Sequence, residues 1–170
     1  ERKVFTKFGV LRFMSPWRNF GAPFLPPFPA DISVHDVVLL PGVGLLMTVP
    51  NLHMILCYDI EDGITSVYAG TGTVGDTRGF RTASQLGTPR SLCVTPEGEV
   101  LFTDDTLKCI FKILKDGMIE VWAGLHSAHI RCQFAYPMGL CGMGDDRYLV
   151  SQQVIRDNGF LLIDSRTAKV

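Results

Sequence analysis

A cluster of potential metal ligands lies in one short segment of the sequence. His126, His129 and Cys132 follow one another at intervals of three residues. Zinc takes four nitrogen or sulfur ligands in structural sites, or three plus an open position in catalytic sites. This spacing could supply three ligands from one loop, but no Cys-x-x-Cys pair accompanies it. The segment is a weak candidate for a metal site, and a connecting loop with two surface histidines is the simpler interpretation.

Two further motifs suggest chemistry at first sight. The segment from Gly70 to Gly75 matches the G-x-G-x-x-G pattern, and Asp104-Asp105 and Asp145-Asp146 are carboxylate pairs. A dinucleotide site also needs a helix that begins at the glycines, and the residues that follow lack helical periodicity. Asp favours turns because its side chain bonds the neighbouring backbone. We therefore expect loops and turns here, and no cofactor.

The elements that position these residues are indicated by an internal repeat. Asp62-Gly63 followed by Tyr68-Ala-Gly70 returns as Asp116-Gly117 followed by Trp122-Ala-Gly124, fifty-four residues later and without a gap from Gly44 and Gly98 onward. A weaker third copy begins near Pro137, forty-eight residues after Pro89. Self-similarity at this period indicates a repeat architecture.

Each copy contains short apolar runs that are separated by turn residues. An Asp-Gly pair between two apolar runs favours a hairpin, because Gly tolerates the positive φ of tight turns. No window has the sustained period of a helix. The sequence predicts an all-β protein with strands at 34–40, 45–49, 54–60, 65–69, 90–94, 100–103, 109–114, 118–123 and 160–164.

The segment between the first two copies resembles the inter-blade segment of NHL-repeat β-propellers. There, an aromatic-Ala-Gly strand end leads through a glycine-rich loop to the next blade, as in Val67–Arg90, and Gln133–Pro137 repeats the end of such a loop. The family's Asp-x-x-Asn-x-Arg-Ile run is present only in part, in Asp104–Ile110. The resemblance covers about residues 31–170. It implies β-propeller blades of four antiparallel strands at 31–70, 88–124 and 137–170, in a fold that serves mostly as a protein-interaction platform and in some members binds RNA.

Length and composition limit this interpretation. The 170 residues supply about three blades, whereas a propeller needs at least about four to close, so we expect a part of a longer chain or missing blades from another chain. Residues 1–30 do not repeat and carry four prolines in 22–29, which suggests a linker or strands of a preceding blade.

Charge and cysteine usage bear on partners and location. Net charge is −1 and charged residues make up 19%, which gives no bulk attraction to nucleic acid or anionic membranes. No apolar run is long enough to span a bilayer. The five cysteines lie mostly in predicted strands, which favours an intracellular location.

Loop length predicts the working surface. Loops before the first strand and between the second and third strands share one face, which we call the long-loop face, and they are longer than the hairpins of the opposite face.

We expect a non-catalytic binding module for a protein partner, with RNA as the second candidate. The alternative is a propeller lyase or hydrolase with a metal near the axis, which requires inward ligands that recur between blades. The pairs Asn51/Asp105 and His53/Leu107 do not sustain such a set. The expected partner-binding residues are Arg78, Phe80, Arg81, Asp104, Asp105, Lys108, Arg131 and Phe134.

Overall fold

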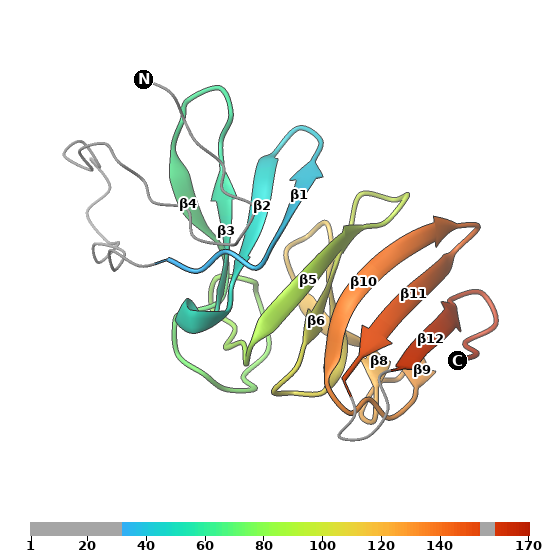
Figure 1. The fold of residues 1–170 in the computed structure, drawn as a ribbon. Helices are drawn as coiled ribbons and strands as arrows, with labels where there is room; N and C mark the ends of the chain where they lie inside the picture. Colours follow the sequence, from blue (N-terminus) through green and yellow to red (C-terminus); the bar gives the residue numbers. More distant parts are fainter. Residues whose placement is uncertain (1–31, 154–158) are drawn as a thin grey trace.

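Three sheets, antiparallel except for one short pair in the second, lie side by side in the computed structural model, which describes residues 32–153 and 159–170 (Figure 1). The expectation for residues 1–30 lies outside this part of the chain. The first sheet consists of β1 (Asp36–Leu40), β2 (Gly44–Val49), β3 (Met54–Tyr58) and β4 (Thr65–Ala69). The second consists of β5 (Pro89–Val94), β6 (Val100–Asp104), β7 (Cys109–Ile113), β8 (Ile119–Gly124) and the short β9 (Ile130–Arg131). The third consists of β10 (Pro137–Gly144), β11 (Arg147–Gln152) and β12 (Gly159–Asp164).

The predicted all-β fold is confirmed, and the nine strands predicted with bounds begin and end within two residues of them. For β10 and β11 only the blade at 137–170 was predicted, and the described residues of that blade form three of its four expected strands. The predicted hairpin glycines have the expected backbone conformation, with φ of 69° at Gly63 and 87° at Gly117. Two elements were not predicted. One is β9, which pairs in parallel with β8 inside a segment expected to be a loop. The other is η1 (Pro50–Leu52), a single 3-10 turn between β2 and β3.

The structure corrects the alignment of the repeat by one residue. The Thr48 and Thr103 hydroxyls each accept a hydrogen bond from the first strand of their own sheet, at 3.0 Å, so these two residues are equivalent. In the second and third strands, equivalent residues of the first and second sheets are therefore fifty-five positions apart. His53 and Lys108, which share a left-handed φ near 55°, are therefore equivalent. The spacing returns to fifty-four after the hairpin between the third and fourth strands, because the loop between β3 and β4 is one residue longer than the loop between β7 and β8.

After that hairpin the fifty-four-residue spacing holds. The pairing of β3 with β4 is interrupted by a bulge at Tyr68, and the pairing of β7 with β8 by a bulge at Trp122. The Trp122 ring then packs edge-on against Tyr148 of β11, with the ring centroids 5.1 Å apart. The aromatic residue of the repeat therefore connects its sheet to the next one.

The core lies between the sheets. One apolar cluster, which includes Leu46 and Phe102, fills the space between the first and second sheets, and another, which includes Leu101 and Val150, joins the second to the third. A third cluster, around Met47 and Leu56, lies on the outer face of the first sheet and includes Ile32 and Val34, which precede β1. The first strands β1, β5 and β10 are neighbours across the sheets. Within the described residues, no helix is long and apolar enough to cross a membrane.

Candidate functional site

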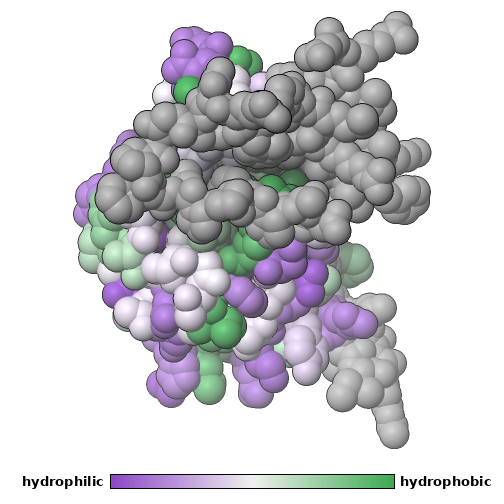
Figure 2. Space-filling view, turned by 90° about the vertical axis from the view of Figure 1, so that its left-hand side faces the viewer, coloured by the Kyte–Doolittle hydropathy of each residue, from purple (hydrophilic) through white to green (hydrophobic). Residues whose placement is uncertain are grey.

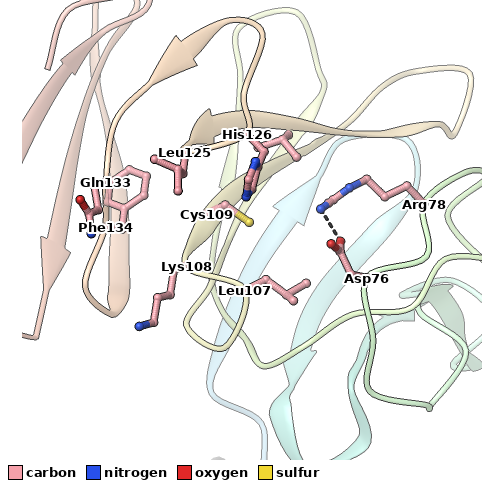
Figure 3. A pocket seen from close by; sticks show the side chains of 10 residues that line it. Asp76, Arg78, Leu107, Lys108, Cys109, Leu125, His126, Gln133 and Phe134 are labelled. Carbon is pink, nitrogen blue, oxygen red and sulfur yellow. Dashed lines mark hydrogen bonds and ion pairs between the residues drawn. The ribbon is translucent and has the colours of Figure 1, made fainter.

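A cavity of about 240 Å³ opens beside the second sheet, where two connecting segments meet the turn between β6 and β7 (Figure 3). The connector from β4 to β5 contributes one side, and the segment from β8 to β10 contributes the other. The cavity is lined by Asp76, Arg78, Leu107, Lys108, Cys109, Val121, Leu125, His126, Gln133 and Phe134. Of the expected partner-binding residues, the structure brings Arg78, Lys108 and Phe134 together here.

Arg78 is held on one side of the cavity by two contacts. Its guanidinium forms an ion pair with Asp76 and lies over the ring of Phe111, 4.4 Å from the centroid. The aromatic face attracts the cation, and the carboxylate neutralises much of its charge. Arg78 is therefore oriented before any ligand arrives, and its side chain keeps 31% of its surface exposed.

Lys108 carries the second permanent positive charge of the cavity. It follows the β6–β7 turn with a left-handed φ of 53°, and its side chain is exposed. Its ammonium lies 5.1 Å from the ring centroid of Tyr136, and it forms no ion pair with any described residue. The cavity therefore carries a modest excess of positive charge on the Lys108 side.

The interior of the cavity is apolar. Phe134 and Cys109 are buried beneath it at 2% and 5% exposure, and Leu107 and Val121 are half-buried. Burial raises the pKa of the Cys109 thiol well above its usual value, so this sulfur stays protonated at neutral pH. Gly124 must lack a side chain because a Cβ there would lie 2.8 Å from the Cβ of Cys109. A small space with an apolar floor and cationic sides suits a ligand group that combines hydrocarbon with negative charge.

Asp104 has a structural place, which corrects its expected position on an exposed surface. The residue is fully buried, and its carboxylate accepts hydrogen bonds from the backbone N–H groups of Gly87, Thr88, Thr106 and Leu107 at 2.8–3.2 Å. In the third sheet Gln152 has the equivalent place and accepts from the N–H of Ala135 at 3.1 Å. Both side chains fix the incoming connector to the end of the second strand.

Asp105 is also committed to an internal contact, because its carboxylate binds the guanidinium of Arg90 at 2.6 Å and is only 14% exposed. Phe134 lies in the core cluster between the second and third sheets. It forms the floor of the cavity, where its expected contact with a partner stays a prediction.

The connector from β4 to β5 does not stay on the long-loop face, which corrects the place of Phe80 and Arg81. Phe80 forms a β-bridge with Met118, and the N–H of Arg81 donates to the carbonyl of Gly117, beside the β7–β8 hairpin of the opposite face. Arg81 also donates to the carbonyl of Tyr68 at 2.5 Å and covers its ring. Arg131 is exposed in β9 and is not one of the residues that line the cavity.

The weak metal candidate is not assembled. His126 lines the cavity, whereas the ring of His129 lies 3.4 Å from the Glu120 carboxylate and Cys132 packs against a core cluster. Burial raises the pKa of the Cys132 thiol to about 11, which disfavours the thiolate that a metal needs. Across residues 32–153 and 159–170, no three His, Cys, Asp or Glu side chains are grouped closely enough to hold a metal ion.

Sequence reasoning missed two kinds of residue. It placed Asp76 on the long-loop face but did not include it among the partner-binding residues, although Asp76 orients Arg78 from two positions away. It also passed over Thr48 and Thr103, whose hydroxyls connect one sheet to the next. The repeat contained that signal, but the fifty-four-residue alignment placed these two threonines one position apart.

The chain is similar to solved structures, although sequence comparison finds no relative. No protein-family model matches the chain, and no curated protein matches it by sequence. An auxiliary nutrient binding protein of Bacteroides thetaiotaomicron superposes with a TM-score of 0.57 and 20% identity, over 71% of this chain and 35% of that one. A catalytically inactive virginiamycin B lyase of Staphylococcus aureus, solved with quinupristin, gives a TM-score of 0.53 and 16% identity, over 82% and 44%. A protein of unknown function from B. thetaiotaomicron superposes with a TM-score of 0.55 and 23% identity, over 62% of this chain and 29% of that one.

These similarities define the class of protein. The chain is an all-β protein of the β-propeller type, built from antiparallel sheets that act as blades. The identities are too low to show more than the fold, and the chain spans less than half of the length of each of these structures. Propellers of this type include both binding proteins and enzymes, so the function must be argued from the site itself.

Proposed function

We propose that the chain is a non-catalytic binding module of the NHL type, which uses the cavity beside the second sheet to bind a protein partner. One observation carries the proposal. Arg78 and Lys108, which come from different connecting segments, lie on the sides of one cavity whose floor is apolar. Such a cavity fits an exposed segment with an acidic side chain next to an apolar one.

The contacts within the cavity support a chemically selective site. Arg78 is held by Asp76 and the ring of Phe111, so little side-chain entropy is lost when a carboxylate binds it. Lys108 supplies long-range attraction for an acidic segment. An apolar group of the partner that packs on this floor would exclude water and so strengthen an ion pair formed beside it. Two of the similar structures are named as auxiliary nutrient binding proteins, which is compatible with a binding role.

The two other classes have less support. RNA binding relies on several unpaired cations along a groove. Here Arg78 is paired with Asp76, and Arg90 with Asp105. A propeller enzyme with a metal near the axis needs a group of ligands, and no such group is present in the part of the chain that the structure describes.

The proposal can be tested with a displayed library of random peptides. Selection on the purified chain should enrich peptides that carry Asp or Glu beside an apolar residue. A synthetic peptide from the enriched set, followed by fluorescence anisotropy, should bind Lys108→Glu at least about tenfold more weakly than the unaltered chain, because attraction becomes repulsion.

The matched control is Lys115→Glu, which makes the same charge change in the exposed β7–β8 hairpin of the opposite face. This variant should keep the affinity of the unaltered chain. Equal losses in both variants would show a response to net charge alone and would contradict a specific site at the cavity. Tight binding of a single-stranded RNA oligonucleotide, with a steep fall in affinity as salt is raised, would assign the surface to RNA instead.

A further inference from the structure

His126 is a side chain of the cavity that the proposed function does not use. Its exposed imidazole points into the cavity, between Arg78 and Lys108 in the view of Figure 3. It forms neither a hydrogen bond nor an ion pair with another described residue. A side chain that can change its charge near neutral pH therefore lies beside the two permanent cations of the cavity.

A tight turn holds His126 at this place. The N–H of Ser127 donates to the carbonyl of Gly124 at 3.2 Å, which closes a four-residue turn. Leu125 and His126 are the two central residues of this turn. The buried hydroxyl of Ser127 also donates to the carbonyl of Trp122, at 2.7 Å. The backbone that carries the imidazole is thus bonded to the end of β8.

The charged groups that face His126 come from two other segments. The connector from β4 to β5 contributes Asp76 and Arg78, and the β6–β7 turn contributes Lys108. Burial keeps the Cys109 thiol of the floor protonated. The cavity therefore has two cations and one carboxylate while His126 is neutral, and a third cation when the imidazole is protonated.

A second histidine of the same segment provides a comparison. His129 is also exposed, but its Nε2 lies 3.4 Å from the carboxylate of Glu120. That carboxylate also binds Lys112 at 3.4 Å, and Lys112 binds Glu99 at 3.2 Å. His129 is not one of the residues that line the cavity. Its protonation therefore strengthens a group of ion pairs beside the cavity residues without adding a charge to the cavity itself.

The attraction for an acidic ligand has to come from such local charges. The whole chain has a net charge of −1, which gives no general attraction for an acidic segment. Figure 2 views the molecule from the side of the first sheet, and hydrophilic and hydrophobic residues are interspersed over the coloured part of that surface. Protonation of His126 raises the excess of positive charge in the cavity from one to two.

We infer that His126 is a third ligand-binding residue of the cavity, whose imidazolium form binds the acidic group of the partner, so that affinity increases as the pH falls. The inference rests on the proposed function, because the acidic segment is its ligand. The side chains of Asp and Glu ordinarily lose their proton at about pH 4, whereas an imidazole ordinarily titrates between about pH 5 and 8. The ligand therefore stays charged while the histidine gains its charge. Binding of the anion stabilises the imidazolium in turn, so the complex takes up protons as it forms.

The pH profile of peptide binding tests the inference. The probe is an N-terminally acetylated peptide from the enriched set, chosen without histidine or cysteine, so its charge is constant between about pH 5 and 8. Fluorescence anisotropy should show that the unaltered chain binds it about three- to fivefold more tightly at the acidic end of this range, which is the effect of one additional exposed ion pair. His126→Gln should lose this increase and keep the weaker affinity at every pH. His126→Lys should have the higher affinity at every pH.

The matched control is His129→Gln, which removes the other histidine of the same segment and should keep the pH profile of the unaltered chain. Circular dichroism over the same pH range establishes that each variant is folded. An increase that persists in His126→Gln, or one that is lost in His129→Gln, would overturn the inference.

Lys108→Glu separates this inference from the proposed function. If Lys108→Glu weakens binding while His126→Gln keeps the full pH profile, the cavity is the binding site and only the role of His126 is wrong. If Lys108→Glu binds as tightly as the unaltered chain, or if the library yields no acidic peptide, the proposed function and the inference are both wrong.

Discussion

The interface between the first and second sheets and the interface between the second and third use the same polar framework with different side chains. In both, a threonine hydroxyl donates to a carbonyl of the next first strand at 2.8 Å. In the first interface the Asp36 carboxylate accepts the Ser91 hydroxyl and the Leu92 N–H. In the second, the neutral Ser91 hydroxyl accepts the N–H of Leu140 at 3.1 Å. The backbone therefore determines where a hydrogen-bonding group is needed, and the sequence is free to choose its charge.

The apolar parts of the two interfaces differ more. Tyr68, at the bulge of the first sheet, is half-buried and covered by the guanidinium of Arg81 at 4.3 Å from the ring centroid. Trp122, at the bulge of the second sheet, is 6% exposed and contacts Tyr148 of the third sheet. The same repeat position thus has a peripheral role in one interface and a central role in the other.

The largest effect is expected from removal of these two aromatic residues. Trp122→Ala should lower the free energy of unfolding by about 3–5 kcal/mol, because it leaves a cavity in the buried cluster between the second and third sheets. Tyr68→Ala should cost about 1–2 kcal/mol, since its ring is only half-buried. Urea unfolding followed by circular dichroism measures both. Similar losses in the two variants would mean that the interfaces are energetically alike, against the difference in burial.

A smaller and nearly equal effect is expected at the two threonines. Thr48→Val and Thr103→Val preserve shape and remove a hydroxyl that accepts one backbone N–H and donates to a carbonyl of the next sheet. Because both residues are fully buried, the orphaned groups should lower the free energy of unfolding by about 1–2 kcal/mol in each variant. Ser151→Ala is the control, since its hydroxyl has no acceptor among the described residues. Its loss should be smaller, and a loss as large as that of Thr103→Val would weaken the comparison.

The sequence predicted the fold well because the signals were local. Asp62-Gly63 and Asp116-Gly117 mark hairpins whose geometry depends on a few adjacent residues. The aromatic-Ala-Gly ends mark bulges that recur at identical places. The one-residue difference between the hairpin loops was not visible in the same way. The extra residue of the β3–β4 loop offsets a missing residue earlier in the first copy, so the two copies align without a gap in sequence. Only the pairing of the strands shows the difference.

The candidate site was predicted less well because its assembly depends on packing between distant segments. Arg78 and Lys108 were both singled out, but nothing local showed that they line one cavity with His126. Asp104 was expected at the surface because aspartate usually is exposed. Its burial depends on the N–H groups of Gly87 and Thr88, which are brought to it by the connector from the preceding sheet. Phe80 is displaced for a related reason, since the connector crosses to the opposite hairpin.

The smallest expected effect, and the most specific, is a pH dependence that separates Asp104 from Gln152. These equivalent residues both bind the incoming connector, but only Asp104 can ionise. Burial raises the pKa of its carboxyl above the usual 3.8, although hydrogen bonds from the N–H groups of Leu107, Thr88 and Gly87 oppose that rise. The folded chain thus holds this proton more tightly than the unfolded chain. As the pH increases from about 3.8 through the folded pKa, the contribution of Asp104 to stability must fall.

The measurement is the difference in unfolding free energy between the unaltered chain and Asp104→Asn across this pH window. Other carboxyl groups titrate in both proteins and cancel in the difference. The substitution removes the ionisation and one hydrogen bond, and the lost hydrogen bond should add the same amount to the difference in unfolding free energy at every pH. In addition, the difference in favour of the unaltered chain should decline as the pH rises and then level off. Gln152→Ala removes the neutral equivalent and should give a difference that is independent of pH. A difference that instead grows with pH for Asp104→Asn would show that the four N–H donors outweigh burial and hold the carboxyl ionised. The second sheet would then gain stability from a buried charge at the position where the third sheet has an amide.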